Sequence, residues 1–302
     1  MTALGLSGKL VIGALAGVLS AGVLGAPAPW SAAADIDALR KALTFHASFD
    51  GGVDAVRAAG DAALYSAASF KQRGEATRGL PDSGEVVLAR GEGRFGDALR
   101  FTKKKSPVVF FKGGRNVPYQ SANWSGAVSF WLSVDPAADL EPGFCDPVQI
   151  TPRAWNDGAF FVEFEKRPEA IAFRLGAYSD LKVWNPENRR FADIPQQEKP
   201  LVGIEQLPFG RGKWTHIAFT FDRFNTGRPD GVVRLYLDGK LQGALSPRQQ
   251  TFTWDPENNA IALGQGYIGL LDELSIFDRG LSDAEVRSLY GLEKGVTDLH
   301  RP

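Results

Sequence analysis

The stretch from Lys213 to Gly243, KWTHIAFTFDRFNTGRPDGVVRLYLDGKLQG, most constrains the fold of this chain. In its first half, Ile217, Phe219 and Phe221 alternate with residues of the opposite side of an extended chain, and the second half repeats this period of two. Such alternation is typical of strands with one face in a core. Asp238-Gly239 is a two-residue turn signal. The stretch therefore predicts an antiparallel meander.

The composition is that of an ordinary globular protein: 302 residues, 44% hydrophobic and 23% charged. The formal net charge of −1 implies no general attraction to nucleic acid or to an anionic membrane. Cys145 is the single cysteine, so an internal disulfide is excluded. We expect it to fill space in the core rather than to act as a nucleophile, since no motif places a histidine beside it.

The N-terminal 34 residues have the layout of a signal peptide. Lys9 precedes an apolar run over 10–26, and small residues follow at 32–34. This pattern predicts export with cleavage near Ala34, and the alternative is an uncleaved N-terminal anchor. We therefore expect a secreted, extracellular or periplasmic protein with no membrane contact beyond residues 1–34. Residues 35–43 are expected to be a linker or a short helix.

Short strands separated by turn signals are predicted along most of the remaining chain. The clearest is WSGAVSFWLSVD over 124–135, and further strands are predicted over 148–151, 159–165, 170–176 and 182–184. Residues 52–83 are expected to be a surface excursion, and 186–212 a long loop. This spacing predicts an all-β fold, a two-sheet antiparallel jelly-roll sandwich over 44–292.

One helix is predicted near the C-terminus. Ser282-Asp283-Ala284-Glu285 is a capping-box sequence, an apolar stripe follows, and Gly291 ends it. We expect this helix to cap the edge of the sandwich, followed by a C-terminal tail over 293–302.

Five passages in order resemble the LamG-like branch of the concanavalin A-like lectin/glucanase superfamily. They are GRFGDALRF (93–101), AVSFWLSVDP (127–136), GKWTHIAFTFD (212–222), VRLYLDGKLQG (233–243) and GLLDELSIFDRGLSDAEVRSLY (269–290). The resemblance implies a jelly roll whose first and last strands pair. It also implies a glycan-facing or adhesive role more often than catalysis.

Asp50 and Asp272 are the candidate metal ligands. Asp50 ends the first predicted strand and Asp272 lies in the last, so their carboxylates would be close if these strands pair. Oxygen-rich sites of this kind suit calcium, and the resemblance implies a structural calcium ion. The alternative is that Asp50 accepts turn amides and that Asp272 pairs with a base such as Arg279.

Glu163 and Glu165 are the candidate catalytic carboxylates. They lie two apart on a predicted strand and so share a face. Paired carboxylates act as acid and base in glycoside cleavage, but the glucanases of this superfamily carry a denser acidic strand. The alternative is a solvated strand face paired with Lys166 or Arg167.

Candidate glycan-binding residues are aromatic. Trp155, Tyr178, Trp184 and Trp254 lie in or beside predicted loops, where exposed rings can stack on sugars. The alternative is that they cover the core. The basic residues Lys103, Lys104, Lys105, Lys112 and Arg115 could attract an anionic glycan, or could simply lie in a solvated loop.

Three functions remain open on the sequence. The first is a secreted, non-catalytic domain that binds carbohydrate or mediates adhesion. The second is a polysaccharide-cleaving enzyme, a hydrolase or a lyase, on the same fold. The third is a structural protein of the cell envelope.

Overall fold

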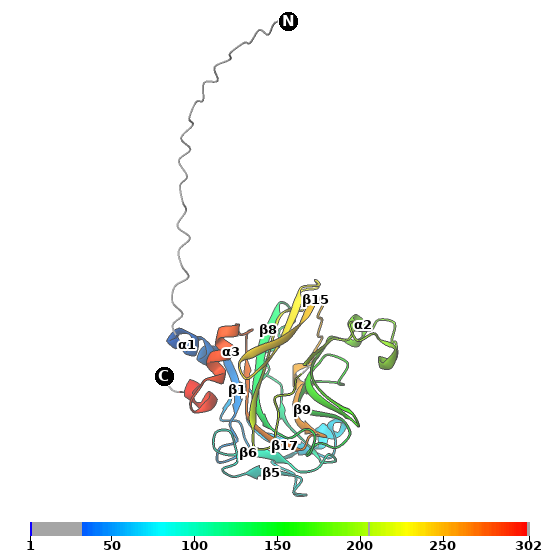
Figure 1. Ribbon diagram of the computed structural model, residues 1–302. Coiled ribbons are helices and arrows are strands. Elements are labelled where there is room, and N and C mark those ends of the chain that lie inside the picture. Colours follow the sequence, from blue (N-terminus) through cyan, green and yellow to red (C-terminus); the bar gives the residue numbers. More distant parts are fainter. Residues whose placement is uncertain (2–31, 205, 301–302) are drawn as a thin grey trace. The chain divides into compact units, whose positions relative to one another are not determined.

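Apolar residues at every second position build two antiparallel sheets that face each other in this computed structural model (Figure 1). The structure describes residues 1, 32–204 and 206–300. The first sheet runs in the order β15 (Lys240–Arg248), β14 (Gly231–Leu237), β13 (Trp214–Phe224), β8 (Trp124–Ser133), β17 (Gly269–Phe277), β1 (Leu43–Ala47) and β2 (Arg57–Ala58), with β6 (Ala98–Phe101) paired to β17 and β5 (Val86–Ala89) to β6.

The second sheet carries the surface on which the candidate site lies. Its order is β12 (Leu201–Ile204), β11 (Ala170–Tyr178), β10 (Ala159–Arg167), β9 (Gly143–Thr151), β16 (Ala260–Gln265), β7 (Val108–Lys112), β3 (Leu64–Ala67) and β4 (Thr77–Arg78). Two antiparallel sheets with few helices confirm the predicted jelly-roll class.

The predicted meander and the pairing of the first and last strands are both present. Strands β13, β14 and β15 are consecutive neighbours, and Asp238 and Gly239 have φ of +47° and +74° at the turn. Positive φ at both residues matches the twist of a tight hairpin. Strand β1 pairs with β17, with Ala47 opposite Leu274. The ends of the domain therefore lie side by side.

The core between the sheets is rich in aromatic rings. Trp124 is fully buried and contacts Phe221 at 4.7 Å and Trp254 at 4.9 Å between ring centroids. Cys145 is a buried free thiol in the same core, as expected, and burial raises its pKa to about 12.

Helices cover the outer face of the first sheet. Helix α3 (Asp283–Tyr290) has the predicted capping box, and it lies beside α1 (Ala32–Ala42) in Figure 1. Leu39 and Val286 from these helices form one buried cluster with Ala218 and Tyr236 of the sheet. The expectation that the helix caps the sandwich edge is therefore wrong, because small and apolar outward side chains create a docking surface on the face.

The N-terminal end of the domain agrees with one of the two sequence expectations, and the C-terminal end differs from its expectation. Residues 32–42 form α1, which agrees with the short-helix alternative, whereas the 3₁₀ helix η4 (Gly295–His300) buries Val296 and Leu299, so the expected tail is packed. Most of the predicted signal peptide lies outside the described residues, and cleavage near Ala34 would fall inside α1. Among the described residues, no helix has the length and apolar character needed to cross a bilayer.

Three further predictions need correction. Residues 52–83 contribute β2, β3 and β4 to the sheets and the 3₁₀ helix η1 (Phe70–Glu75). The strand expected at 182–184 is the helical turn α2 (Leu181–Trp184). The long loop after it holds the 3₁₀ helix η2 (Phe191–Asp193) and β12, and a further 3₁₀ turn, η3 (Pro256–Asn258), precedes β16.

Candidate functional site

A cavity of about 580 Å³ hollows the outer face of the second sheet. Strands β9, β10, β11 and β16 supply its floor, and the loop after β9 together with η1 and η2 supplies its walls. The floor follows from strand alternation: Phe160 and Val162 point into the core, so Phe161 and Glu163 point outward. We call this cavity the aromatic pocket.

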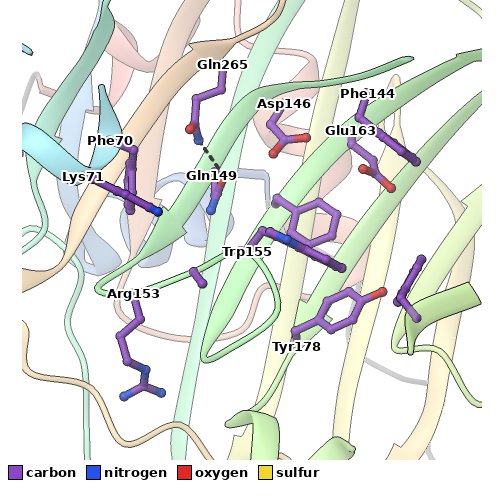
Figure 2. Close-up of a pocket in the computed structure, with 13 residues that line it drawn as sticks. Phe70, Lys71, Phe144, Asp146, Gln149, Arg153, Trp155, Glu163, Tyr178 and Gln265 are labelled. Carbon is purple, nitrogen blue, oxygen red and sulfur yellow. Dashed lines mark hydrogen bonds between the residues drawn. The ribbon is translucent and has the colours of Figure 1, made fainter. Parts of the chain in front are cut away.

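Four rings form one side of the aromatic pocket (Figure 2). Trp155, which is 41% exposed, contacts Phe161, Tyr178 and Phe191 with centroid distances of 6.3, 5.6 and 5.3 Å. Phe161 stacks on Tyr178 at 5.4 Å. A Cβ at Gly176 would lie only 2.3 Å from the ring of Phe161, so the absence of a side chain there lets the ring cross β11.

Polar groups lie among these rings. Gln265 donates a hydrogen bond to Gln149 at 2.6 Å, and Asp146 and Glu163 lie near each other (Figure 2). Tyr178 is fully buried from bulk solvent, and its hydroxyl has no hydrogen-bond partner within the described residues. Rings beside polar groups that are free to bond suit a ligand with both apolar faces and hydroxyls.

The structure separates the two glutamates predicted as a catalytic pair. Glu163 lines the pocket, whereas Glu165 is not a lining residue. Arg174 pairs with both, at 2.5 and 3.0 Å, and Arg167 also pairs with Glu165. Both carboxylates are buried, so the solvated face of the alternative interpretation is wrong while its pairing with Arg167 is confirmed. Burial raises the pKa of Glu163, although Arg174 opposes this.

The four predicted ligand-binding rings fall into two groups. Trp155 and Tyr178 line the pocket, and Trp184 supports it from behind, 4.8 Å from Tyr178, with its indole N–H donated to Asn156 O. Trp254 is 6% exposed and donates its N–H to Gly158 O in the core. Exposure of Trp254 is therefore not observed, because its ring completes the cluster around Trp124.

Asp50 and Asp272 approach the same segment, residues 93–97. Asp50 Oδ1 accepts the amide of Asp97 at 2.9 Å, and Asp272 Oδ2 accepts that of Phe95 at 3.1 Å. Asp272 is fully buried without an ion pair to any described residue, and burial raises its pKa to about 8. The alternative pairing with Arg279 is wrong, since that side chain binds Glu285.

A calcium ion at this corner stays a prediction. Within 32–204 and 206–300, no three His, Cys, Asp or Glu side chains are grouped as ligands for a metal. An ion bound here would need main-chain oxygens beside the two carboxylates. It would supply the positive charge that buried Asp272 lacks.

A buried polar chain continues from the same corner. Glu273 lies 3.0 Å from His46, and His46 lies 3.0 Å from His300. Burial raises the pKa of Glu273 to about 8 and lowers that of His46 to about 3, so both groups favour their neutral forms. His216 elsewhere in the first sheet is likewise held at a pKa of about 3 by burial.

The basic segment predicted to attract an anionic glycan is partly neutralised. Lys103 lies 3.7 Å from Glu85, and Lys112 lies 3.4 Å from Asp61. Lys104 donates to the carbonyl of Pro142. None of these lysines lines the aromatic pocket.

Sequence reasoning missed Asp146, Gln149, Phe161 and Gln265 in the pocket. Period-two alternation could have placed Phe161 beside Glu163 on the outer face. Asp146 and Gln149 lie on the preceding strand β9, whereas Gln265 lies on β16, which is distant in sequence and which only the sheet order brings beside β9.

The fold and this site define a jelly-roll protein with a ring-lined pocket on one sheet. Residues 125–287 match the family described as the concanavalin A-like lectin/glucanases superfamily, and the chain belongs to it. No curated protein sequence matches this chain.

Solved structures with the same fold include two that hold sugars. Domain 4 of AbnA, a GH43 extracellular arabinanase from Geobacillus stearothermophilus, in complex with arabinotriose, has a TM-score of 0.52 and 18% identity, covering 82% of this chain and 97% of that one. The ligand-binding domain of botulinum neurotoxin serotype D, in complex with N-acetylneuraminic acid, has a TM-score of 0.51 and 10% identity, covering 85% of this chain and 52% of that one. At these identities the similarity shows the fold alone.

Proposed function

We propose that this protein is an exported, non-catalytic carbohydrate-binding protein whose ligand occupies the aromatic pocket. The observation that carries the proposal is a cavity lined by the rings of Trp155, Phe161 and Tyr178 together with polar side chains, where the Tyr178 hydroxyl has no hydrogen-bond partner among the described residues. Sugars present apolar C–H faces to rings and hydroxyls to such groups. Sugar complexes of an arabinanase domain and of a toxin domain with this fold support the same class of ligand.

Export and a glycan partner support each other in this proposal. The N-terminal pattern of a charged start, an apolar run and small residues favours an extracellular or periplasmic protein, where polysaccharides are found. An anionic glycan would suit the basic residues 103–105 but not the acidic floor of the aromatic pocket. We therefore assign the pocket to a glycan without negative charge.

The test is a glycan array followed by calorimetry with wild type and Trp155→Ala. We expect binding of at least one oligosaccharide and a loss of tenfold or more in affinity on removing this ring, as is usual for buried aromatic anchors. Tyr290→Ala is the matched control, because Tyr290 is 40% exposed but lies on α3 over the other sheet. Equal binding by both variants, or no binding by wild type, would contradict the proposal.

Cleavage is tested with the same ligands. Asp146 and Glu163 share the pocket, so an enzyme on this fold would use them as its acid and base. We expect no new reducing ends or unsaturated products after prolonged incubation with a bound oligosaccharide. Turnover that Glu163→Gln abolishes would replace binding by catalysis as the function.

A further inference from the structure

A bulge in β9 aims Asp146 into the aromatic pocket. Cys145 and Val148 both belong to the core. Regular alternation would place one residue between two core-facing residues, but here there are two, Asp146 and Pro147. The register with β10 shifts at this place, between the partners of Val162 and Phe164. Proline in a central strand is found at bulges because it lacks the N–H that the ladder needs, and bulges re-aim side chains next to functional sites.

The carboxyl group of Asp146 has no partner among the described residues. No hydrogen bond or ion pair joins it to another described residue, whereas Arg174 pairs with Glu163 and Glu165, and Arg167 pairs with Glu165. The two glutamates are thus paired with arginines, whereas the Asp146 carboxyl group, which lines the pocket, has no ion pair with a described residue. Figure 2 shows Lys71 and Arg153 away from Asp146 in the cavity, and Arg153 pairs with aspartates outside it.

Aromatic rings also line the pocket near Asp146. Phe144 is 54% exposed, lies two residues before Asp146 on the strand, and lines the pocket with Trp155, Phe161 and Tyr178. Arg174 already lies 5.8 Å from the Phe144 ring, in the arrangement by which a ring attracts a cation. The unpartnered hydroxyl of Tyr178, buried and at the same cavity, is a second free polar group.

We infer that the aromatic pocket selects sugars that carry a protonated amino group, with the Asp146 carboxylate as the counter-charge of the ammonium. This inference rests on the proposed function and names its ligand class. A carboxylate among ring faces offers a cation both a charge-assisted hydrogen bond and cation–π attraction. A uronate or sulfated sugar would instead meet the unpaired Asp146 carboxyl group.

The surroundings of Asp146 disfavour its charged form. Burial, followed by the nearby charge of Glu163, raises the pKa of Asp146 well above its ordinary value, and Arg174 opposes this.

The experiment compares a glucosamine oligomer with the N-acetylated oligomer of the same length. Calorimetry is run at about pH 6, below the pKa of a typical amino group, with wild type, Asp146→Asn and Asp193→Asn. Asp193 is an exposed carboxylate that pairs with Arg190 at 2.7 Å, so it controls for general attraction of a polycation. Thermal unfolding checks that each variant is folded.

We expect wild type to bind the amino oligomer about tenfold or more tightly than the acetylated one, the size of a hydrogen bond to a charged group. Asp146→Asn should bring that ratio close to one, and Asp193→Asn should keep it. Wild type alone decides the question if Asp146→Asn does not fold. Equal affinity for both oligomers, with binding still dependent on Trp155, would overturn the inference and leave the proposed function intact. Binding of no oligosaccharide would overturn both.

Discussion

Replacing Gly176 by alanine tests whether the floor of the aromatic pocket depends on one missing side chain. The new Cβ would lie 2.3, 2.6 and 2.7 Å from three atoms of the Phe161 ring, closer than non-bonded atoms approach. Either the ring tilts off Tyr178, on which it stacks at 5.4 Å, or strand β11 shifts. Both changes reshape the pocket.

The magnitude follows from the packing. Overfilling a well-packed site costs about 1–3 kcal/mol, and the restricted unfolded chain returns roughly 0.4–1 kcal/mol on Gly→Ala replacement. We therefore expect Gly176→Ala to lower the free energy of unfolding by about 1–2 kcal/mol. For a domain of this size that lowers Tm by roughly 2–8 °C.

Gly203→Ala is the matched control. Gly203 lies on the neighbouring strand β12, and a Cβ there would meet only Arg174 Cγ, at 3.9 Å. We expect this variant to be as stable as wild type within about 0.5 kcal/mol. Gly176→Ala added to Phe161→Ala should cost little beyond Phe161→Ala alone, since the clashing ring is gone.

The assay is urea unfolding followed by tryptophan fluorescence, with the midpoint and the m-value fitted for each variant. A shift in midpoint at constant m reports stability alone. Equal midpoints for Gly176→Ala and Gly203→Ala would refute the reasoning, and so would a cost that persists after Phe161 is removed.

Three further predictions concern the corner and the core. The folded-state pKa values of Asp272 and Glu273, both about 8, exceed the values of the unfolded chain, so the folded state binds more protons and its stability falls as pH rises towards 8. The decline in stability is clearest above pH 6.5, where the buried histidines no longer oppose it. In chelator, Asp272→Asn should reduce the slope of the free energy of unfolding against pH by up to about 1.4 kcal/mol per pH unit. Calcium should raise Tm in proportion to the logarithm of its concentration, and Asp50→Asn should remove the increase. Trp254→Ala should lower the free energy of unfolding by about 3–5 kcal/mol, whereas Trp155→Ala should lower it much less, because only the Trp254 ring lies in the core.

Each of these predictions has a clear contrary result. A flat stability profile between pH 6.5 and 8 in chelator would show that the two carboxyl groups are ionised in the fold. Identical melting curves with calcium and with chelator would remove the calcium prediction. A Trp254→Ala protein as stable as Trp155→Ala would place Trp254 outside the core.

The jelly roll could be predicted from the sequence because its signals are local. Period-two alternation through 213–243, the Asp238-Gly239 turn and the capping box at Ser282 each depend on a few neighbouring residues, and each is present in the structure. The pairing of the first and last strands came from the family resemblance and is also observed. Trp155 and Tyr178 could also be predicted as site residues from the sequence, because both are rings beside predicted turns.

The aromatic pocket was decided by the tertiary structure. Gln265 lies on β16, which is distant in sequence and pairs with β9 opposite Asp146, and no local pattern encodes that pairing. Burial likewise distinguishes Trp155 from Trp254, although both lie in or beside predicted loops. Only Trp254 faces the space between the sheets. Local alternation determines which side chains share a face of a strand, whereas long-range pairing determines which strands bring those faces together.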